Sequence, residues 1–316
     1  MPPKKKQLIS IVIPCYNDED NLSPLYKELE KILLSDTTYN FQLVLINDWS
    51  RDTTWEGIKK LSKLDKRIIW LNLSRNFGHQ WALTAWLEKA TWDAIISMDS
   101  DLQDPVAVAK DMIVQWEKWY EVVYGRRIDR NDSFLKNQTA ILYYKILSLI
   151  SDTKIPRNVG DFRLIDKKVL KAFLSLKEKD RYIRGMFAWL WFNTWYVDFV
   201  RPERLQWESW YTIRKLLQLA MDGVLSFSMF PLRIWFIIWI IMIFLSLIFS
   251  TFMTMQVIIA WDIYFYQLYK WISVIGFWVM GLQFIFIWIL WEYVGRVYNE
   301  ARERPVYIIS DTINTK

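Results

Sequence analysis

The sequence predicts an α/β domain with a mostly parallel sheet, followed by two membrane-spanning helices. Three observations lead to this fold class. Short, β-branched apolar runs alternate with helical patterns from Leu8 to Tyr124. Two long uncharged runs follow near the C-terminus. With 53% hydrophobic residues among 316, the chain is too apolar to be disordered.

The first elements are a strand and a helix. Leu8 to Pro14 is a continuous apolar run of strand length, and a helical pattern from Leu22 to Leu34 follows it. The alternation then repeats, with strands at 41–46, 68–73, 94–98 and 121–124 and with helices at 54–64, 79–90 and 105–119. Strands that alternate with helices form parallel sheets whose ligands bind beyond the carboxyl ends of the strands. We therefore expect functional residues at those ends.

Acidic side chains stand at three of the strand ends. Asp18 follows the first strand, Asp48 the second, and Asp99, Asp101 and Gln103 the fourth. Carboxylate and amide oxygens that converge in this way suit Mg²⁺ or Mn²⁺, which also bridge substrate phosphates. The alternative is a plain solvated acidic loop. No glycine-rich dinucleotide fingerprint and no P-loop is present in the sequence.

The composition narrows the chemistry. One cysteine, Cys15, and one histidine, His79, exclude an internal disulfide and any metal site built from several cysteines or histidines. The net charge of +6 comes from 40 Lys and Arg against 34 Asp and Glu, which suits an anionic partner. We expect no nucleic acid, because the basic excess lies largely near the membrane helices rather than in an aromatic-lined groove.

The C-terminal third predicts membrane insertion. No charged residue occurs from Ile234 to Trp261 or from Trp271 to Trp291, whereas a helix needs about 20 residues to span a bilayer. Basic residues on the outer flanks place both termini in the cytoplasm by the positive-inside rule. Tyr211 to Gly223 carries an amphipathic pattern. The alternative for the two uncharged runs is a pair of helices buried in a large protein. The alternative for residues 211–223 is a helix that faces the core of the domain.

The expected organisation has four parts. Residues 1–210 form a cytoplasmic catalytic domain, 211–232 an amphipathic juxtamembrane helix, 233–292 two transmembrane helices at about 234–256 and 271–291, and 293–316 a cytoplasmic tail. The apolar stretch that ends at Pro14 is shorter than the core of a signal peptide, about 7 to 15 residues, so we expect no cleaved signal.

A set of motifs resembles a known family. IVIPCYND, INDWSRD, NLSRNFGHQ, MDSDLQDP, VYGRR, NVGDFRL, RYIRG and RPERLQWES occur in this order. The chain resembles family 2 glycosyltransferases, and more narrowly the membrane-bound polyprenyl-phosphate glycosyltransferases. This resemblance implies a GT-A fold, a divalent cation (Mg²⁺ or Mn²⁺) and inverting transfer of a sugar from a nucleotide diphosphate sugar to a lipid phosphate. It also implies UDP-glucose as donor, undecaprenyl phosphate as acceptor, and a multi-pass protein of the inner (plasma) membrane.

The resemblance also implies roles for individual residues. Donor-binding positions are Pro14, Tyr16, Asp18, Asp48, Asp99, Ser100, Arg201 and Arg204. Metal ligands are Asp99, Asp101 and Gln103, and the lipid phosphate is assigned to Arg127, Lys136 and Arg163. Asp161 and Asp101 are the catalytic candidates. Asp161 either positions the acceptor, holds donor hydroxyls or anchors Arg163.

Other roles stay open at this point. His79 either contacts donor phosphate or is a satisfied helix-terminal residue, and Arg184 either faces phosphate or lies in a solvated helix start. Arg201 and Arg204 alternatively bind lipid headgroups. Alternative functions are a catalytically impaired scaffold that binds nucleotide sugars and a GDP-mannose-using enzyme. A homo-oligomer is expected.

The chain departs from the resembled pattern at its tryptophans, of which there are 20 against 9 glycines. Relatives usually have glycine at seven of these positions: Trp49, Trp86, Trp92, Trp119, Trp191, Trp207 and Trp291. Trp210 stands where a lysine is usual. Glycine supplies conformations that tryptophan adopts only with strain.

Overall fold

The computed structural model describes residues 6–87, 92–128, 156, 158–179, 181, 183–200, 230–259 and 265–313. Its strands are β1 (Leu8–Cys15), β2 (Asn40–Asn47), β3 (Ile68–Leu73), β4 (Ala94–Ser97), β5 (Val122–Arg127), β6 (Val159–Asp166), β7 (Thr194–Phe199) and β8 (Ile309–Ile313). Its helices are α1 (Glu19–Leu29) with the π-helix η1 (Glu30–Leu34), α2 (Thr54–Leu64), α3 (His79–Leu87), α4 (Val106–Glu117), α6 (Lys167–Ser175), α7 (Ile183–Trp189), α9 (Phe230–Ile259) and α10 (Phe265–Ala301).

The strands form one sheet in the order β7-β5-β6-β4-β1-β2-β3-β8. β4, β1, β2 and β3 are parallel to one another, as predicted. The sheet as a whole is mixed, because β6 runs antiparallel to both β4 and β5, and β8 runs antiparallel to β3. β5 and β7 run in the same direction as the first four strands, because β5 is also antiparallel to β6 and β7 is parallel to β5. The expectation of a mostly parallel sheet therefore holds, and β6 and β8 are the strands that run in the opposite direction.

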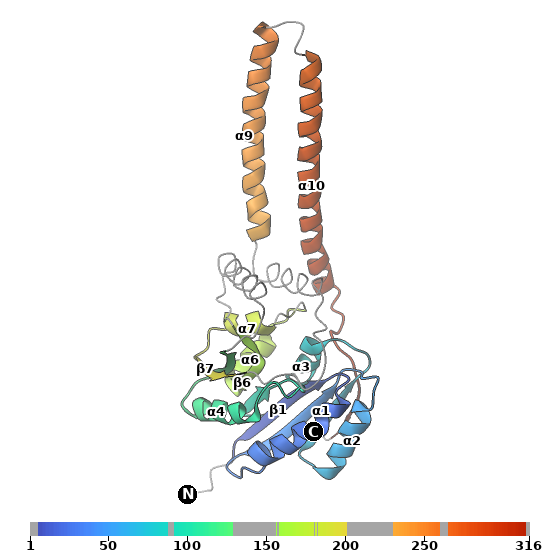
Figure 1. Ribbon diagram of the computed structural model, residues 1–316, viewed down its shortest axis with the longest axis vertical. Helices are drawn as coiled ribbons and strands as arrows, with labels where there is room; N and C mark the ends of the chain where they lie inside the picture. The colour runs from blue at the N-terminus through green and yellow to red at the C-terminus, as the bar shows by residue number, and fades with distance from the viewer. Residues whose placement is uncertain are drawn as a thin grey trace.

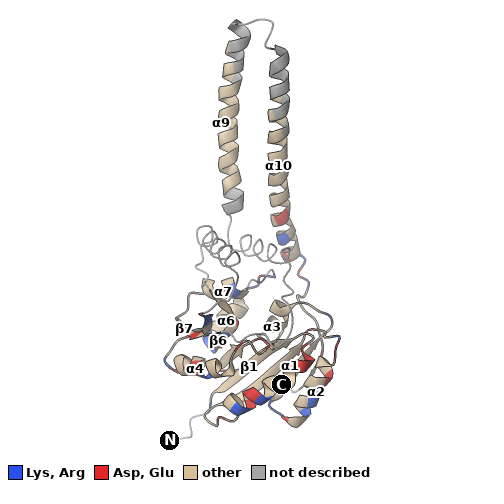
Figure 2. Cartoon of the chain, in the orientation of Figure 1, with Lys and Arg blue, Asp and Glu red and all other residues tan. Residues whose placement is uncertain are grey.

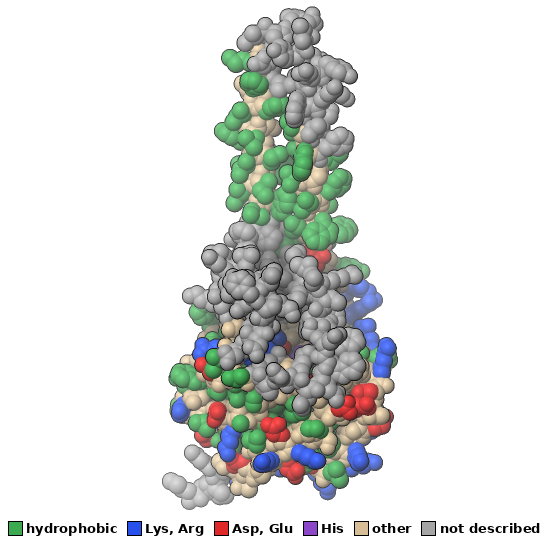
Figure 3. Space-filling view, viewed as in Figure 1, with side chains coloured by type: hydrophobic (Ala, Val, Ile, Leu, Met, Phe, Trp, Pro, Cys, Tyr) green, Lys and Arg blue, Asp and Glu red, His purple; other side chains and the backbone are tan. Residues whose placement is uncertain are grey.

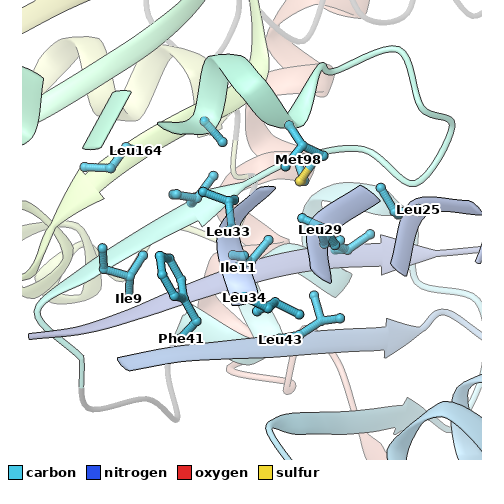
Figure 4. Packing of buried hydrophobic residues seen from close by; sticks show 14 of the residues in the cluster. Ile9, Ile11, Leu25, Leu29, Leu33, Leu34, Phe41, Leu43, Met98 and Leu164 are labelled. Atoms are coloured by element: carbon cyan, nitrogen blue, oxygen red, sulfur yellow. The ribbon is translucent and has the colours of Figure 1, made fainter. Parts of the chain in front are cut away.

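Apolar residues cover both faces of this sheet. One cluster joins β1 and β2 to α1, η1 and α4, and Figure 4 shows its centre, where Leu29 and Leu33 meet Ile11 and Leu43. A second cluster on the opposite face joins the sheet to α3, α6 and α7. β1 is buried on both faces, which explains why its sequence is a continuous apolar run.

Two long helices rise from this domain. α9 and α10 run side by side away from the sheet (Figure 1), and Trp235 packs against Phe286 with ring centroids 6.1 Å apart. Figure 2 shows charged residues across the α/β domain and, among the residues of α10 that it colours by type, at the end near the domain. Many of the described side chains farther along both helices are hydrophobic and exposed (Figure 3).

Within the described residues, one helical stretch, Trp278–Ala301, has the length and hydropathy of a membrane span, and Ile234–Phe249 is a shorter apolar helix. This supports membrane association. The two-span hairpin, its topology and the expected homo-oligomer stay predictions. The amphipathic helix predicted at 211–232 lies outside the described residues.

The chain returns from α10 to the sheet. β8 pairs with the outer edge of β3, and the backbone N–H of Ser74 donates to the carbonyl of Ile308 at 2.9 Å. The Lys179 side chain donates to the carbonyl of Glu300, at the end of α10, at 2.9 Å. The range 293–316, predicted as a tail, thus supplies the last turns of α10 and a strand of the α/β domain.

Candidate active site

The topology gathers the candidate residues at one edge of the sheet. β1 lies between β2 and β4, and all three end at this edge. β6 begins there, because it is antiparallel to β4 and its Arg163 pairs with Ser97. The segments that follow β1, β2 and β4 therefore meet the start of β6. Asp18, Asp48, Asp99 and Asp161 come from these four segments.

Asp18 links the first and fourth strand ends. Its carboxylate accepts a hydrogen bond from the Ser100 hydroxyl at 2.7 Å and from the Tyr16 backbone N–H at 2.9 Å. Burial raises the pKa of Asp18, and these two hydrogen bonds act in the opposite direction. Pro14 is buried in β1, whereas the Tyr16 side chain is exposed at the rim. This arrangement leaves the Tyr16 ring accessible at the edge of the site.

Asp48 fixes the loop that leads into α3. Its two carboxylate oxygens accept hydrogen bonds from the backbone N–H groups of Phe77 and Gly78, each at 2.8 Å. Gly78 has φ +94°, a conformation that favours glycine. Burial raises the pKa of Asp48, whereas these two hydrogen bonds act to lower it. The geometry favours a role for Asp48 in holding His79 at the start of α3.

The segment after β4 is an acidic loop, residues 99–104. The Asp99 backbone N–H donates to Asp104 at 3.0 Å, and the Gln103 N–H donates to Asp101 at 3.2 Å. Leu102 adopts φ +60°. Burial raises the pKa of Asp99, and the nearby Asp161 and Asp101 raise it further against the opposing effect of His79. The loop thus concentrates negative charge.

The acidic loop fits a divalent cation. Among the described residues, no group of three or more His, Cys, Asp and Glu side chains forms a metal cage. The predicted set is instead two carboxylates and one amide, from Asp99, Asp101 and Gln103. Mg²⁺ is commonly held by one or two carboxylates together with substrate phosphates. A cation would also relieve the repulsion that raises the pKa of Asp99.

Asp161 is a buried carboxylate held by two arginines. Arg163 donates to Oδ1 at 2.7 Å, and Arg184 donates to Oδ2 at 3.0 Å and to Oδ1 at 3.2 Å. Gln80 adds a bond of 3.3 Å to Oδ2. Burial alone would raise the pKa of Asp161, but Arg184, Arg163 and His79 hold it well below its ordinary value. A carboxylate of this kind is a weak proton acceptor.

His79 lies between the acidic loop and Asp161. Its Nε2 is 3.6 Å from Asp99 Oδ1 and 3.7 Å from Asp161 Oδ2. The side chain is partly exposed. Of the two sequence alternatives, this position at the junction of two carboxylates favours a place in the site.

The two described arginines of the predicted lipid-phosphate set differ in exposure. Arg163 is fully buried beneath Tyr124 and Phe187, and its guanidinium faces Asp161 and the Gly160 carbonyl. This geometry favours the structural alternative, in which Asp161 and Arg163 anchor each other. Arg127 at the end of β5 is 21% exposed, with Nη2 3.9 Å from Asp104 Oδ1.

Three predicted residues, Arg201, Arg204 and Lys136, lie outside the described residues. The structure adds two that the sequence did not assign to the site, Gln80 and Asp104. They stand in the NFGHQ and MDSDLQDP motifs, so motif membership is the signal for them. Of the two sequence alternatives for Arg184, its contact with Asp161 favours a place in the site.

Comparisons with known proteins agree with the family that the sequence motifs indicate. The sequence profile of glycosyl transferase family 2 matches residues 10–174. The uncharacterized glycosyltransferase YkcC of Bacillus subtilis is 38% identical across 95% of this chain and 92% of its own. The prophage bactoprenol glucosyl transferase homolog of Escherichia coli is 37% identical across 95% of this chain and 98% of its own. Bactoprenol glucosyl transferase of Shigella phage SfV is 36% identical across 96% of this chain and 98% of its own.

Among solved structures, a mannosyltransferase of Pyrobaculum calidifontis in complex with GDP-Man and Mn²⁺ aligns over 70% of each chain. Its TM-score is 0.46 at 13% identity.

Proposed function

The chain belongs to glycosyl transferase family 2 and is a glycosyltransferase, and we propose that it transfers a sugar from a nucleotide diphosphate sugar to a polyprenyl phosphate at the cytoplasmic membrane face. The observation that carries this proposal is the meeting of the acidic loop 99–104 with Arg127 and Arg184 at one edge of the sheet. Carboxylates and partly exposed arginines lie close together there, in a domain continuous with exposed apolar helices.

The acidic loop is the donor side. Asp99, Asp101 and Gln103 would hold Mg²⁺ or Mn²⁺, which neutralises the charge that develops on the departing nucleotide diphosphate. Tyr16 and Asp18 line the adjacent rim, where the nucleotide binds in this proposal. The bond from the anomeric carbon to the diphosphate breaks as a phosphate oxygen of the acceptor forms the new bond. This single displacement inverts the anomeric centre.

The arginines form the acceptor side. Arg127 and Arg184 are partly exposed, and guanidinium groups bind phosphate through charge-assisted hydrogen bonds. A phosphate monoester already carries a charge of about −1.5 to −2 near pH 7, so its oxygen needs no strong general base. Asp161, with its lowered pKa and occupied oxygens, then acts by orienting Arg184. Its direct participation in catalysis stays a prediction.

Glucose from a UDP donor and undecaprenyl phosphate as acceptor are the proposed substrates. They are supported by relatives named bactoprenol glucosyl transferase that match this chain over nearly its full length. GDP-mannose is the alternative donor. The membrane helices bring the acceptor's prenyl chain to the domain, because a lipid phosphate is confined to the bilayer surface.

The test is transfer of radiolabelled sugar by the full chain in detergent. We expect label from UDP-glucose to enter the organic phase with undecaprenyl phosphate and Mn²⁺, and to stay aqueous with EDTA. If label is transferred from GDP-mannose and not from UDP-glucose, GDP-mannose is the donor and the proposed class of reaction stands. Absence of transfer from both donors, while UDP still binds, would overturn the proposal in favour of a binding scaffold.

A further inference from the structure

Asp104 joins the donor and acceptor sides through its two oxygens. Its side chain is fully buried, and Oδ2 accepts the Asp99 backbone N–H at 3.0 Å, which fixes the start of the acidic loop. Oδ1 faces Arg127 Nη2 at 3.9 Å and accepts no hydrogen bond from any described residue. Burial, together with the nearby Asp99, raises the pKa of Asp104 to about 7, and Arg127 is the cation that opposes this rise.

Arg127 is confined around this contact. Its backbone N–H donates to the Asn158 carbonyl at 3.0 Å, which fixes the end of β5. A β-carbon added to Gly160 would lie 3.0 Å from Arg127 Nη2, closer than most real contacts, so glycine leaves room for the guanidinium. Arg127 Nε has no acceptor among the described residues. The guanidinium thus has Nη2 toward Asp104, and the Arg127 side chain is still 21% exposed, so an anion can approach its exposed part.

We propose that Asp104 is a positioning residue that aligns Arg127 with the acidic loop, and so aligns the acceptor phosphate with the donor. This role rests on the proposed function. Direct contact of Asp104 with substrate is excluded by its burial. The positioning of Arg127 can be tested separately from the support of the acidic loop. An amide in place of the carboxylate keeps an acceptor for the Asp99 N–H but loses the charge that attracts Arg127.

The test compares Asp104→Asn with Asp111→Asn, a matched control on the exposed face of α4. Three quantities are measured on the full chain in detergent: the Kd for UDP with Mn²⁺, the Kd for undecaprenyl phosphate, and the KM for undecaprenyl phosphate in sugar transfer. We expect Asp104→Asn to raise both the Kd and the KM for undecaprenyl phosphate about tenfold, because one charge-assisted contact contributes on this scale. The Kd for UDP should stay within about twofold.

Two results would overturn the inference. Equal losses of UDP and undecaprenyl phosphate binding would mean that Asp104 only supports the loop. Unchanged undecaprenyl phosphate binding would mean that Asp104 does not position Arg127. Failure of the proposed function is distinguishable, because the wild-type chain would then bind both ligands without transfer, and the two Kd values would still decide the role of Asp104.

A second inference comes from the backbone. Trp49, Trp119 and Trp191 have φ of +62°, +72° and +54°, in the left-handed region. Their side chains are exposed, by 43%, 85% and 73% respectively, so packing does little to compensate the strain. Non-glycine residues in this region are mainly Asn, Asp and His, because a bulky side chain crowds the following carbonyl.

The composition points the same way. The chain has 20 Trp and 9 Gly, whereas glycine alone is usually about 7% of residues. Among the described glycines only Gly78 has positive φ, so tryptophan occupies more left-handed positions than glycine does. We infer that the organism's own chain carries glycine at 49, 119 and 191. A codon that its ribosomes read as glycine, and that is read here as tryptophan, would produce this pattern.

Mass spectrometry of the protein from the organism that carries the gene tests this directly. The tryptic peptide Trp119–Arg126 contains one tryptophan, and we expect it to be lighter by the difference between tryptophan and glycine. In recombinant protein, Trp119→Gly should raise the Tm by about 2–8 °C, and Trp119→Ala should raise it less because alanine keeps the β-carbon. An intact tryptophan in the native peptide would overturn the inference.

Discussion

Arg184 and Asp161 form a two-point contact, with Nη2 3.0 Å from Oδ2 and Nε 3.2 Å from Oδ1. It joins α7 to the first residues of β6 across the site. The Asp161 end is buried, whereas the Arg184 side chain is 31% exposed. The pair therefore presents a fixed cation to the site while its counter-charge stays inside the domain.

Removal of the Asp161 charge should destabilise the domain. Asp161→Asn leaves the fully buried Arg163 without a counter-charge, and breaking a buried pair in this way costs about 3–5 kcal/mol of unfolding free energy. Arg184→Gln should cost less, about 1–2 kcal/mol, because this side chain is partly exposed. Urea unfolding of the full chain in detergent measures both. Equal losses for the two variants would contradict this assignment.

The stability contributed by Asp161 should depend on pH with a defined sign. Its folded-state pKa lies below the unfolded value of about 3.9, so its contribution is fully present above that value and is lost as pH falls through the folded pKa. The difference in unfolding free energy between wild type and Asp161→Asn should be constant above about pH 5 and shrink below about pH 4. If the difference in unfolding free energy between the two proteins disappeared between pH 6 and pH 8, the Asp161 pKa would not be lowered in the folded state.

The C-terminal strand should support the domain. β8 supplies backbone hydrogen bonds to the outer edge of β3, and Ser310 donates to the Asn72 carbonyl at 3.0 Å. Deletion of 309–316 should lower the Tm and promote aggregation, because it exposes the edge of β3. Deletion of 314–316 alone is the matched control and should leave the Tm unchanged. A full-length Tm in the longer deletion would show that β8 is dispensable.

The predicted hairpin has a testable topology. In a Cys15→Ser background, a cysteine at position 262 should react with a membrane-impermeant maleimide in intact cells, because the positive-inside rule places the loop between the helices outside. A cysteine at Asp311, in β8, should react only after lysis. Labelling at both positions in intact cells, or at neither, would rule out two spans with cytoplasmic termini.

The local sequence predicts the first half of the domain well. β1 to β4 and α2 follow the expected segments closely, because buried parallel strands are apolar throughout and amphipathic helices have a clear period. β6, β7 and β8 were not predicted as strands. β7 is a partly exposed edge strand, β8 pairs with a strand more than two hundred residues away, and β6 contains the charged Asp161 and Arg163.

The site divides in the same way. Asp18, Asp48 and the acidic loop stand at strand ends, so their meeting follows from the parallel topology. The roles of Asp48 and Arg163 do not, because they depend on partners from other segments: the Phe77–Gly78 amides for Asp48, and the burial of Arg163 under Phe187. Arg184 enters through tertiary packing alone.

In the proposed function, the acidic loop drives sugar transfer to a lipid phosphate. The most direct test is label transfer from UDP-glucose to undecaprenyl phosphate by wild type, Asp101→Asn and the control Asp111→Asn, with Mn²⁺ and saturating donor. We expect lipid-linked label with wild type and the control, and a loss of at least about 100-fold with Asp101→Asn. Transfer by Asp101→Asn at the wild-type rate would contradict this role of the acidic loop.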